Sequence, residues 1–205
     1  MKILLATDGS ESSEEAARFL THLALTPQDQ IIVLHVLSQI PYDDDYHARI
    51  KRVIRAVAPR VVRSTMQILQ PVKANLRAIA IEGYPDTTIV ETAVEEDADL
   101  IAMGARGVRG LKVLVLGSAT RAVAINSPKH TLVVKKPLPG QGIRKVLFAY
   151  DGSNCAFLTG TFLAKIPFPE DTEAAVLHVT QTAVSDIPHQ FIEKDESETI
   201  REIPE

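Results

Sequence analysis

Apolar runs alternate with segments of helical periodicity along the first two thirds of the chain. Residues 3–6 and 31–37 are apolar runs bounded by turn residues, a pattern typical of buried strands. Between them, apolar residues recur every three or four positions, at Ala16, Phe19 and Leu20. The alternation predicts strands joined by crossover helices, and therefore a parallel sheet.

The pattern continues until five strands are complete. A helix is expected at residues 46–70, with Pro59 as a kink or break, because proline removes a helical hydrogen bond. Ser12 and Glu15 have the spacing of a capping box for the first helix. Right-handed crossovers then favour an open, doubly wound sheet. The remaining expected elements are a strand at 77–82, a helix at 87–96, a strand at 100–103, a helix after Gly117 and a strand at 131–134.

The chain repeats itself at an offset of 145 − 2 = 143 residues. KILLATDGS at 2–10 recurs as KVLFAYDGS at 145–153, with six of nine positions identical, and VLHV at 33–36 recurs at 176–179. A stretch rich in proline and glycine separates the copies, as is typical of a linker. We therefore expect a complete domain at 1–136, a linker at 137–143, a partial second repeat of strand, helix and strand at 144–180, and a poorly ordered acidic tail at 181–205.

Composition excludes several classes of protein. The 205 residues are 45% apolar and 23% charged, as in a globular domain with a sizeable core. No apolar stretch resembles a leader or a membrane span, so we expect a cytoplasmic protein without membrane contact. The net charge of −4 argues against nucleic acid as a partner, and the basic cluster of residues 49–63 is interpreted as a solvated helix face. Cys155, the single cysteine, is interpreted as a packing residue.

Three glycines lie at the end of the predicted fourth strand and in the segment after it. They form the pattern Gly104-x2-Gly107-x9-Gly117-Ser118, which ends where a helix is expected to begin. Glycines let backbone amides approach a ligand, and the start of a helix offers unpaired N–H groups that suit phosphate oxygens. The alternative interpretation is that the glycines only mark turns.

These residues resemble the universal stress proteins, whose ATP-binding signature G-x2-G-x9-G-[ST] is matched in full. The resemblance, also carried by the opening KILLATDGS, implies an adenine nucleotide alpha hydrolase-like α/β fold with strand order 3-2-1-4-5, in a homodimer. It implies that ATP or another adenine nucleotide, with Mg²⁺ arriving on its phosphates, is the cofactor. The residues that it implies around the nucleotide are Thr7 and Asp8 at the adenosine, Val36 in the adenine pocket, and Gly104, Gly107, Gly117 and Ser118 around the ribose and phosphates, with Arg106 inside the same loop in an open role.

Other interpretations of these residues stay open. Asp8, followed by Gly-Ser, is also typical of a turn or a helix cap, and His35 and His178 are interpreted as core residues. No metal site and no catalytic residue is predicted. The leading hypothesis is a nucleotide-dependent regulatory switch in a stress response, acting on an unknown protein partner. One alternative is an enzyme of the same architecture, either a slow ATPase or a phosphoryl- or adenylyl-transferring enzyme; the GxxxxGK[ST] loop that would favour it is missing from the sequence. The other alternative is a nucleotide-free structural dimer module.

Overall fold

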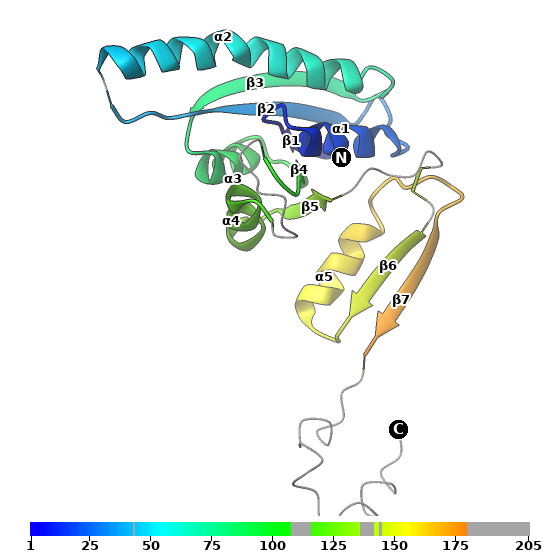
Figure 1. The fold of residues 1–205 in the computed structure, drawn as a ribbon. Helices are drawn as coiled ribbons and strands as arrows, with labels where there is room; N and C mark the ends of the chain where they lie inside the picture. The colour runs from blue at the N-terminus through cyan, green and yellow to red at the C-terminus, as the bar shows by residue number, and fades with distance from the viewer. Residues whose placement is uncertain (43, 108–115, 136–141, 144, 180–205) are drawn as a thin grey trace, which may run out of the picture.

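Five parallel strands form the central sheet of residues 1–135, here called the first unit (Figure 1). The computed structural model describes residues 1–42, 44–107, 116–135, 142–143 and 145–179. The strand order is β3-β2-β1-β4-β5, which confirms the predicted open, doubly wound fold. The strands are β1 (Lys2–Ala6), β2 (Gln30–Ser38), β3 (Asn75–Gly83), β4 (Leu100–Gly104) and β5 (His130–Val134).

Helices cover both faces of this sheet. Ile3 and Leu5 of β1 pack in one apolar cluster with α1 and the end of α2, whereas Leu4 and Ala6 pack in a second cluster with α3 and α4. Strand side chains alternate between faces, so consecutive apolar residues in β1 are all buried. Each fully buried leucine stabilises the fold by about 1.5–3 kcal/mol. The helices are α1 (Glu11–Thr21), α2 (Asp45–Ile68), α3 (Pro85–Glu95) and α4 (Ser118–Asn126).

Two local expectations are wrong. The cap of α1 is Ser10, whose hydroxyl accepts a hydrogen bond from the Ser13 N–H, and Glu15 pairs with Arg18 instead of closing a box with Ser12. The break expected at Pro59 does not occur, because α2 runs as one helix from Asp45 to Ile68; a kink there stays a prediction. Packing of the helix against the sheet compensates for the lost hydrogen bond.

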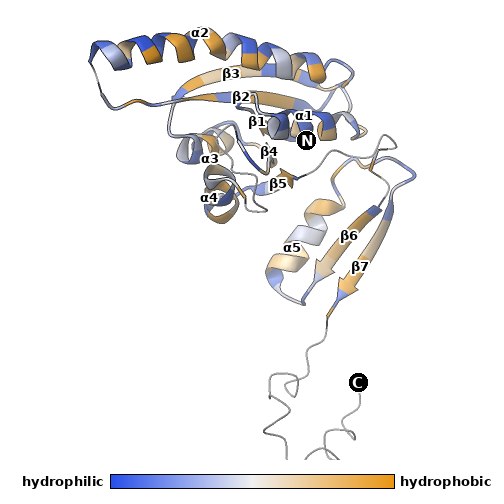
Figure 2. Ribbon diagram, in the orientation of Figure 1, coloured by the Kyte–Doolittle hydropathy of each residue, from blue (hydrophilic) through white to orange (hydrophobic). Residues whose placement is uncertain are grey.

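The basic residues of α2 point mainly to solvent, as expected. Arg49, Arg52, Arg60 and Arg63 are exposed. Figure 2 shows polar and apolar positions alternating along this helix, which lies over β2 and β3. No helix in the described part of the chain is long and apolar enough to cross a membrane.

A smaller strand–helix–strand segment follows, and we call residues 142–179 the second unit. It consists of β6 (Lys145–Tyr150), α5 (Asn154–Leu163) and β7 (Glu173–His178), with β6 and β7 parallel. Its interpretation as a partial repeat stays a prediction. Most of the expected linker and the whole expected acidic tail lie outside the described residues.

The second unit packs against the first. The Phe162 ring stacks on His130 with 3.8 Å between ring centroids, and the Ala24 N–H donates to the Pro167 carbonyl at 2.7 Å. Ile143, only 7% exposed, joins the apolar cluster beneath α1. These contacts dock the second unit beside the end of α1 and the start of β5.

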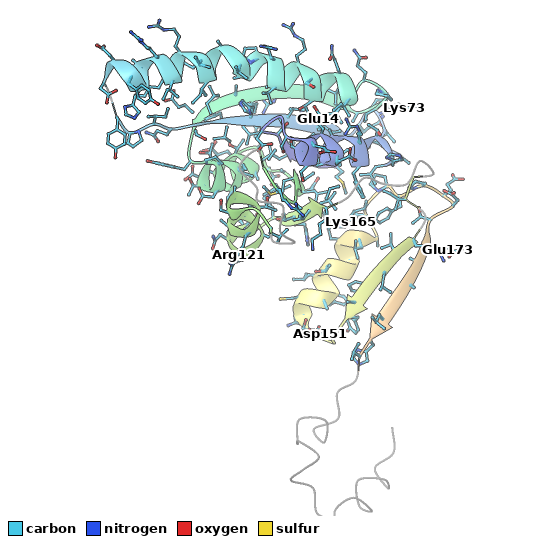
Figure 3. All side chains as sticks on the ribbon, in the orientation of Figure 1. Glu14, Lys73, Arg121, Asp151, Lys165 and Glu173 are labelled. Atoms are coloured by element: carbon cyan, nitrogen blue, oxygen red, sulfur yellow. The ribbon has the colours of Figure 1, made fainter. Side chains whose placement is uncertain are left out.

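Elsewhere the second unit has an apolar surface. Leu147 is 66% exposed, whereas Leu4, the residue 143 positions earlier, is fully buried. Asp151 and Lys165 flank α5, and no charged residue lies between them in the sequence (Figure 3). Cys155 is exposed on this helix, so its interpretation as a packing residue is wrong.

Candidate functional site

A cavity of about 610 Å³ opens at the carboxyl ends of β1, β2 and β4. In an open parallel sheet this is the edge at which ligands bind. All the residues that the family resemblance implies around the nucleotide line this one cavity, although they come from four separate segments of the chain. They are Thr7, Asp8, Val36, Gly104, Arg106, Gly107, Gly117 and Ser118.

The two ends of the glycine pattern lie next to each other. The Gly117 N–H donates to the Ala105 carbonyl at 2.8 Å, and the Thr120 hydroxyl donates to the Gly104 carbonyl at 2.9 Å. Residues 108–115, between these ends, lie outside the described residues. These two hydrogen bonds hold the end of β4 beside the beginning of α4.

Gly107 lies against the Asp8 side chain, so a larger residue there would require the Asp8 carboxylate to move. A Cβ built on Gly107 would collide with the Asp8 carboxylate. That carboxylate also accepts a hydrogen bond from the Ser10 N–H at 3.0 Å, which closes the turn between β1 and α1. Asp8 thus has a structural role in the turn and also lines the cavity; its contact with a nucleotide stays a prediction.

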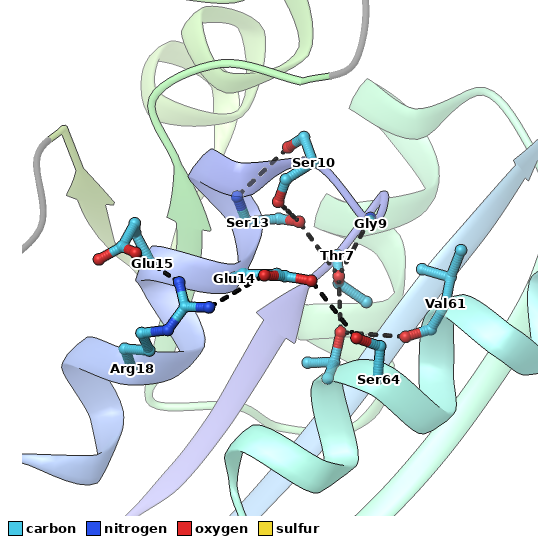
Figure 4. A network of polar contacts seen from close by, with 10 residues as sticks. Thr7, Gly9, Ser10, Ser13, Glu14, Glu15, Arg18, Val61 and Ser64 are labelled. Atoms are coloured by element: carbon cyan, nitrogen blue, oxygen red, sulfur yellow. Dashed lines mark hydrogen bonds and ion pairs between the residues drawn. The ribbon is translucent and has the colours of Figure 1, made fainter.

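The Thr7 side chain is buried in a network of hydroxyl groups (Figure 4). Its hydroxyl hydrogen-bonds to Ser13 at 3.2 Å and to Thr65 at 2.9 Å. The Thr7 carbonyl lies 2.8 Å from the Nδ1 of His35, and His178 repeats this contact with the Tyr150 carbonyl. Thr7 therefore has its hydroxyl and its carbonyl in contacts within the protein, and its contact with a nucleotide stays a prediction.

Further lining residues come from elements that the motif did not indicate. Ile54 of α2 and Pro85, Asp86 and Ile89 of α3 lie around the cavity with Val36. One sequence signal could have found the residues of α3. The Gly83–Pro85 turn follows a predicted strand, and the carboxyl ends of parallel strands share one edge of the sheet.

The start of α4 lines the cavity with the N-terminus of a helix. The helix begins at Ser118 after Gly117, and no acidic residue stands in its first turn. Unpaired N–H groups and the positive end of the helix dipole attract negative charge at such a position. Arg106 is the cationic side chain among the described lining residues. Within the described ranges, no group of three metal-binding side chains gathers.

These features define the class of the protein as a doubly wound α/β sandwich with a glycine-lined cavity at its switch point. The chain belongs to the universal stress protein family, whose sequence profile matches residues 1–135.

Known members of the family resemble about two thirds of the chain, and one solved structure resembles nearly all of it. Universal stress protein MJ0531 from Methanocaldococcus jannaschii is 29% identical over 140 residues, which cover 66% of this chain and 82% of that protein. A universal stress protein structure solved in complex with cAMP is 23% identical, with a TM-score of 0.52, and covers 65% of this chain and 96% of that one. The structure of a universal stress protein from Archaeoglobus fulgidus is 24% identical, with a TM-score of 0.61, and covers 98% of this chain and 71% of that one.

Proposed function

We propose that the first unit binds an adenine nucleotide such as ATP and acts as a nucleotide-dependent switch in a stress response. The observation that carries this proposal is the meeting of both ends of the glycine pattern at one cavity, with Asp8 and Val36 beside them. The alternative, that the glycines only mark turns, does not by itself account for the meeting of Asp8, Val36 and Ser118 around one cavity.

The phosphates would lie along the backbone of Gly104, Gly107 and Gly117, with Ser118 at the helix start. Backbone N–H groups would donate hydrogen bonds to the phosphates. The helix dipole of α4 and the Arg106 guanidinium would supply positive potential. Mg²⁺ would arrive on the nucleotide, because hard cations take phosphate oxygens as ligands.

The base would lie against the apolar part of the lining. Val36, Leu37, Ile54 and Ile89 contribute apolar side chains to it. Such a lining buries the faces of a purine ring while polar groups fix its orientation. The related structure solved with cAMP supports an adenine nucleotide as the ligand class.

We further propose that the protein is a homodimer of chains with two related repeats, regulating an unidentified protein. The 143-residue offset supports the repeat, since it relates both strands and the helix of the second unit to β1, α1 and β2. Exposed Leu147 and Val176 provide apolar surface that a second copy of the chain would cover.

Calorimetric titration with ATP tests nucleotide binding. Gly107→Val should weaken ATP binding at least about tenfold, because its side chain displaces Asp8 and narrows the phosphate path. Phe157→Ala is the control, since this exposed side chain lies in the second unit away from the cavity, and it should leave affinity unchanged. Gly104→Val is unsuitable because its Cβ would strike the backbone of Ser12 and disturb the fold. If the folded Gly107→Val variant binds ATP with the same affinity as the wild-type protein, the proposal is contradicted.

A further inference from the structure

The start of α1 is joined by hydrogen bonds to residues 104–107, here called the glycine segment. The Arg106 N–H donates to the Ser12 hydroxyl at 3.2 Å, and the Ser10 hydroxyl donates to the Arg106 carbonyl at 3.3 Å. The approach is close, because a Cβ on Gly104 would collide with the backbone of Ser12. Both polar backbone groups of Arg106 are thus held by serine side chains from a segment more than 90 residues away.

Only one of these serines is needed to begin the helix. Ser10 is the N-cap and accepts a hydrogen bond from the Ser13 N–H, as capping residues do. Ser12 comes after the cap, and its hydroxyl accepts the hydrogen bond from the Arg106 N–H. Its hydroxyl therefore serves the glycine segment and not the helix.

The second unit offers an internal comparison. Its helix α5 keeps the cap, with Ser153 accepting from the Ala156 N–H, while Cys155 occupies the position of Ser12. Cys155 is exposed, and no glycine segment packs against it within the described residues. The cap is present in both helices, but the hydroxyl of Ser12 is present only where the glycine segment lies against the helix.

Arg106 is placed to use this support. Its side chain lines the cavity, and within the described ranges its guanidinium makes no hydrogen bond or ion pair. Gly107 has no side chain to anchor the chain after Arg106. Because a peptide unit is planar, directing the Arg106 carbonyl toward Ser10 directs the Gly107 N–H away from it.

We infer that Ser12, together with Ser10, is a positioning residue for phosphate binding: the two hydroxyls fix the peptide units on both sides of Arg106. A segment held in its binding conformation loses less conformational freedom when the ligand arrives. This inference rests on the proposed nucleotide function and adds the residues that hold the phosphate end of the site ready.

Paired titrations with ATP and adenosine test the inference on the full chain. Ser12→Ala should weaken ATP binding by about fivefold to tenfold and leave adenosine binding unchanged, since adenosine has no phosphates. Ser12→Thr keeps the hydroxyl and should restore the affinity for ATP. Ser64→Ala removes a hydroxyl that pairs with Glu14, away from Arg106, and should change neither affinity.

The outcomes separate this inference from the proposed function. If the unchanged protein binds neither ATP nor adenosine, the proposed function fails, and the inference fails with it. If the unchanged protein binds ATP but Ser12→Ala binds it equally well, only the inference is overturned. Equal losses for ATP and adenosine in Ser12→Ala would also overturn it, because they would indicate a general structural role.

Discussion

At the scale of single residues, Asp29 links the stability of the fold to pH. Its carboxylate accepts hydrogen bonds from the Met1 ammonium group at 2.6 Å and from the Thr26 N–H and hydroxyl at 2.7 and 2.8 Å. Burial raises the pKa of Asp29, but these hydrogen bonds together lower the pKa more, so that it lies below its ordinary value. The folded state therefore favours the ionised carboxylate.

Asp29→Asn should lower the free energy of unfolding by about 1–3 kcal/mol at neutral pH. A depressed pKa in the folded state gives stability above the unfolded pKa of about 4, and that stability is lost as pH falls through the folded pKa. The difference between the proteins should therefore shrink in acid. Urea unfolding at neutral and acidic pH measures it; a variant with the same pH dependence as the unchanged protein would contradict this role.

A second prediction at this scale concerns turnover of ATP. Fast phosphoryl transfer requires clamping cations and an oriented nucleophile, yet the described lining of the cavity supplies one cationic side chain, Arg106. Arg109 and Lys112 lie outside the described residues. We expect steady-state turnover far below the roughly 1–10³ per second of typical enzymes. Turnover above about one per second that Ser118→Ala abolishes would favour the alternative enzyme function.

At the scale of elements, periodicity was enough to predict the sheet. Buried strands such as β1 and β2 are continuous apolar runs, and parallel pairing then limits the topology. The glycine pattern located the carboxyl end of β4 and the beginning of α4, which meet at the cavity. Local sequence rules could therefore predict the sheet and the phosphate end of the candidate site.

Local rules failed where tertiary contacts decide the outcome. The continuation of α2 through Pro59 depends on packing against the sheet, which no local rule includes. The bond from Arg106 to Ser12 depends on β4 lying beside α1, so it could not be read from the local sequence. The lining residues from α3 were missed although the turn before them was visible in the sequence, because the motif indicated only the ends of β1, β2 and β4.

At the scale of the whole molecule, Phe162 should hold the second unit against the first. Its ring stacks on His130 and packs against the apolar cluster under α1. Phe162→Ala should cost about 2 kcal/mol of stability and speed hydrogen exchange throughout residues 145–179.

Phe157→Ala is a matched control in the same helix, because Phe157 is 64% exposed. It should change stability by no more than about 0.5 kcal/mol. Equal exchange rates in the two variants would contradict a docking role for Phe162.

The central claim is that the first unit holds an adenine nucleotide with its phosphates at the start of α4. Hydrogen exchange followed by mass spectrometry, with and without ATP, tests this location directly. We predict slower exchange in peptides that contain Gly104, Gly107 and Ser118, and unchanged exchange in β6 and β7. Saturating ATP that leaves exchange in the glycine segment and α4 unchanged, or that slows exchange only in the second unit, would contradict the claim.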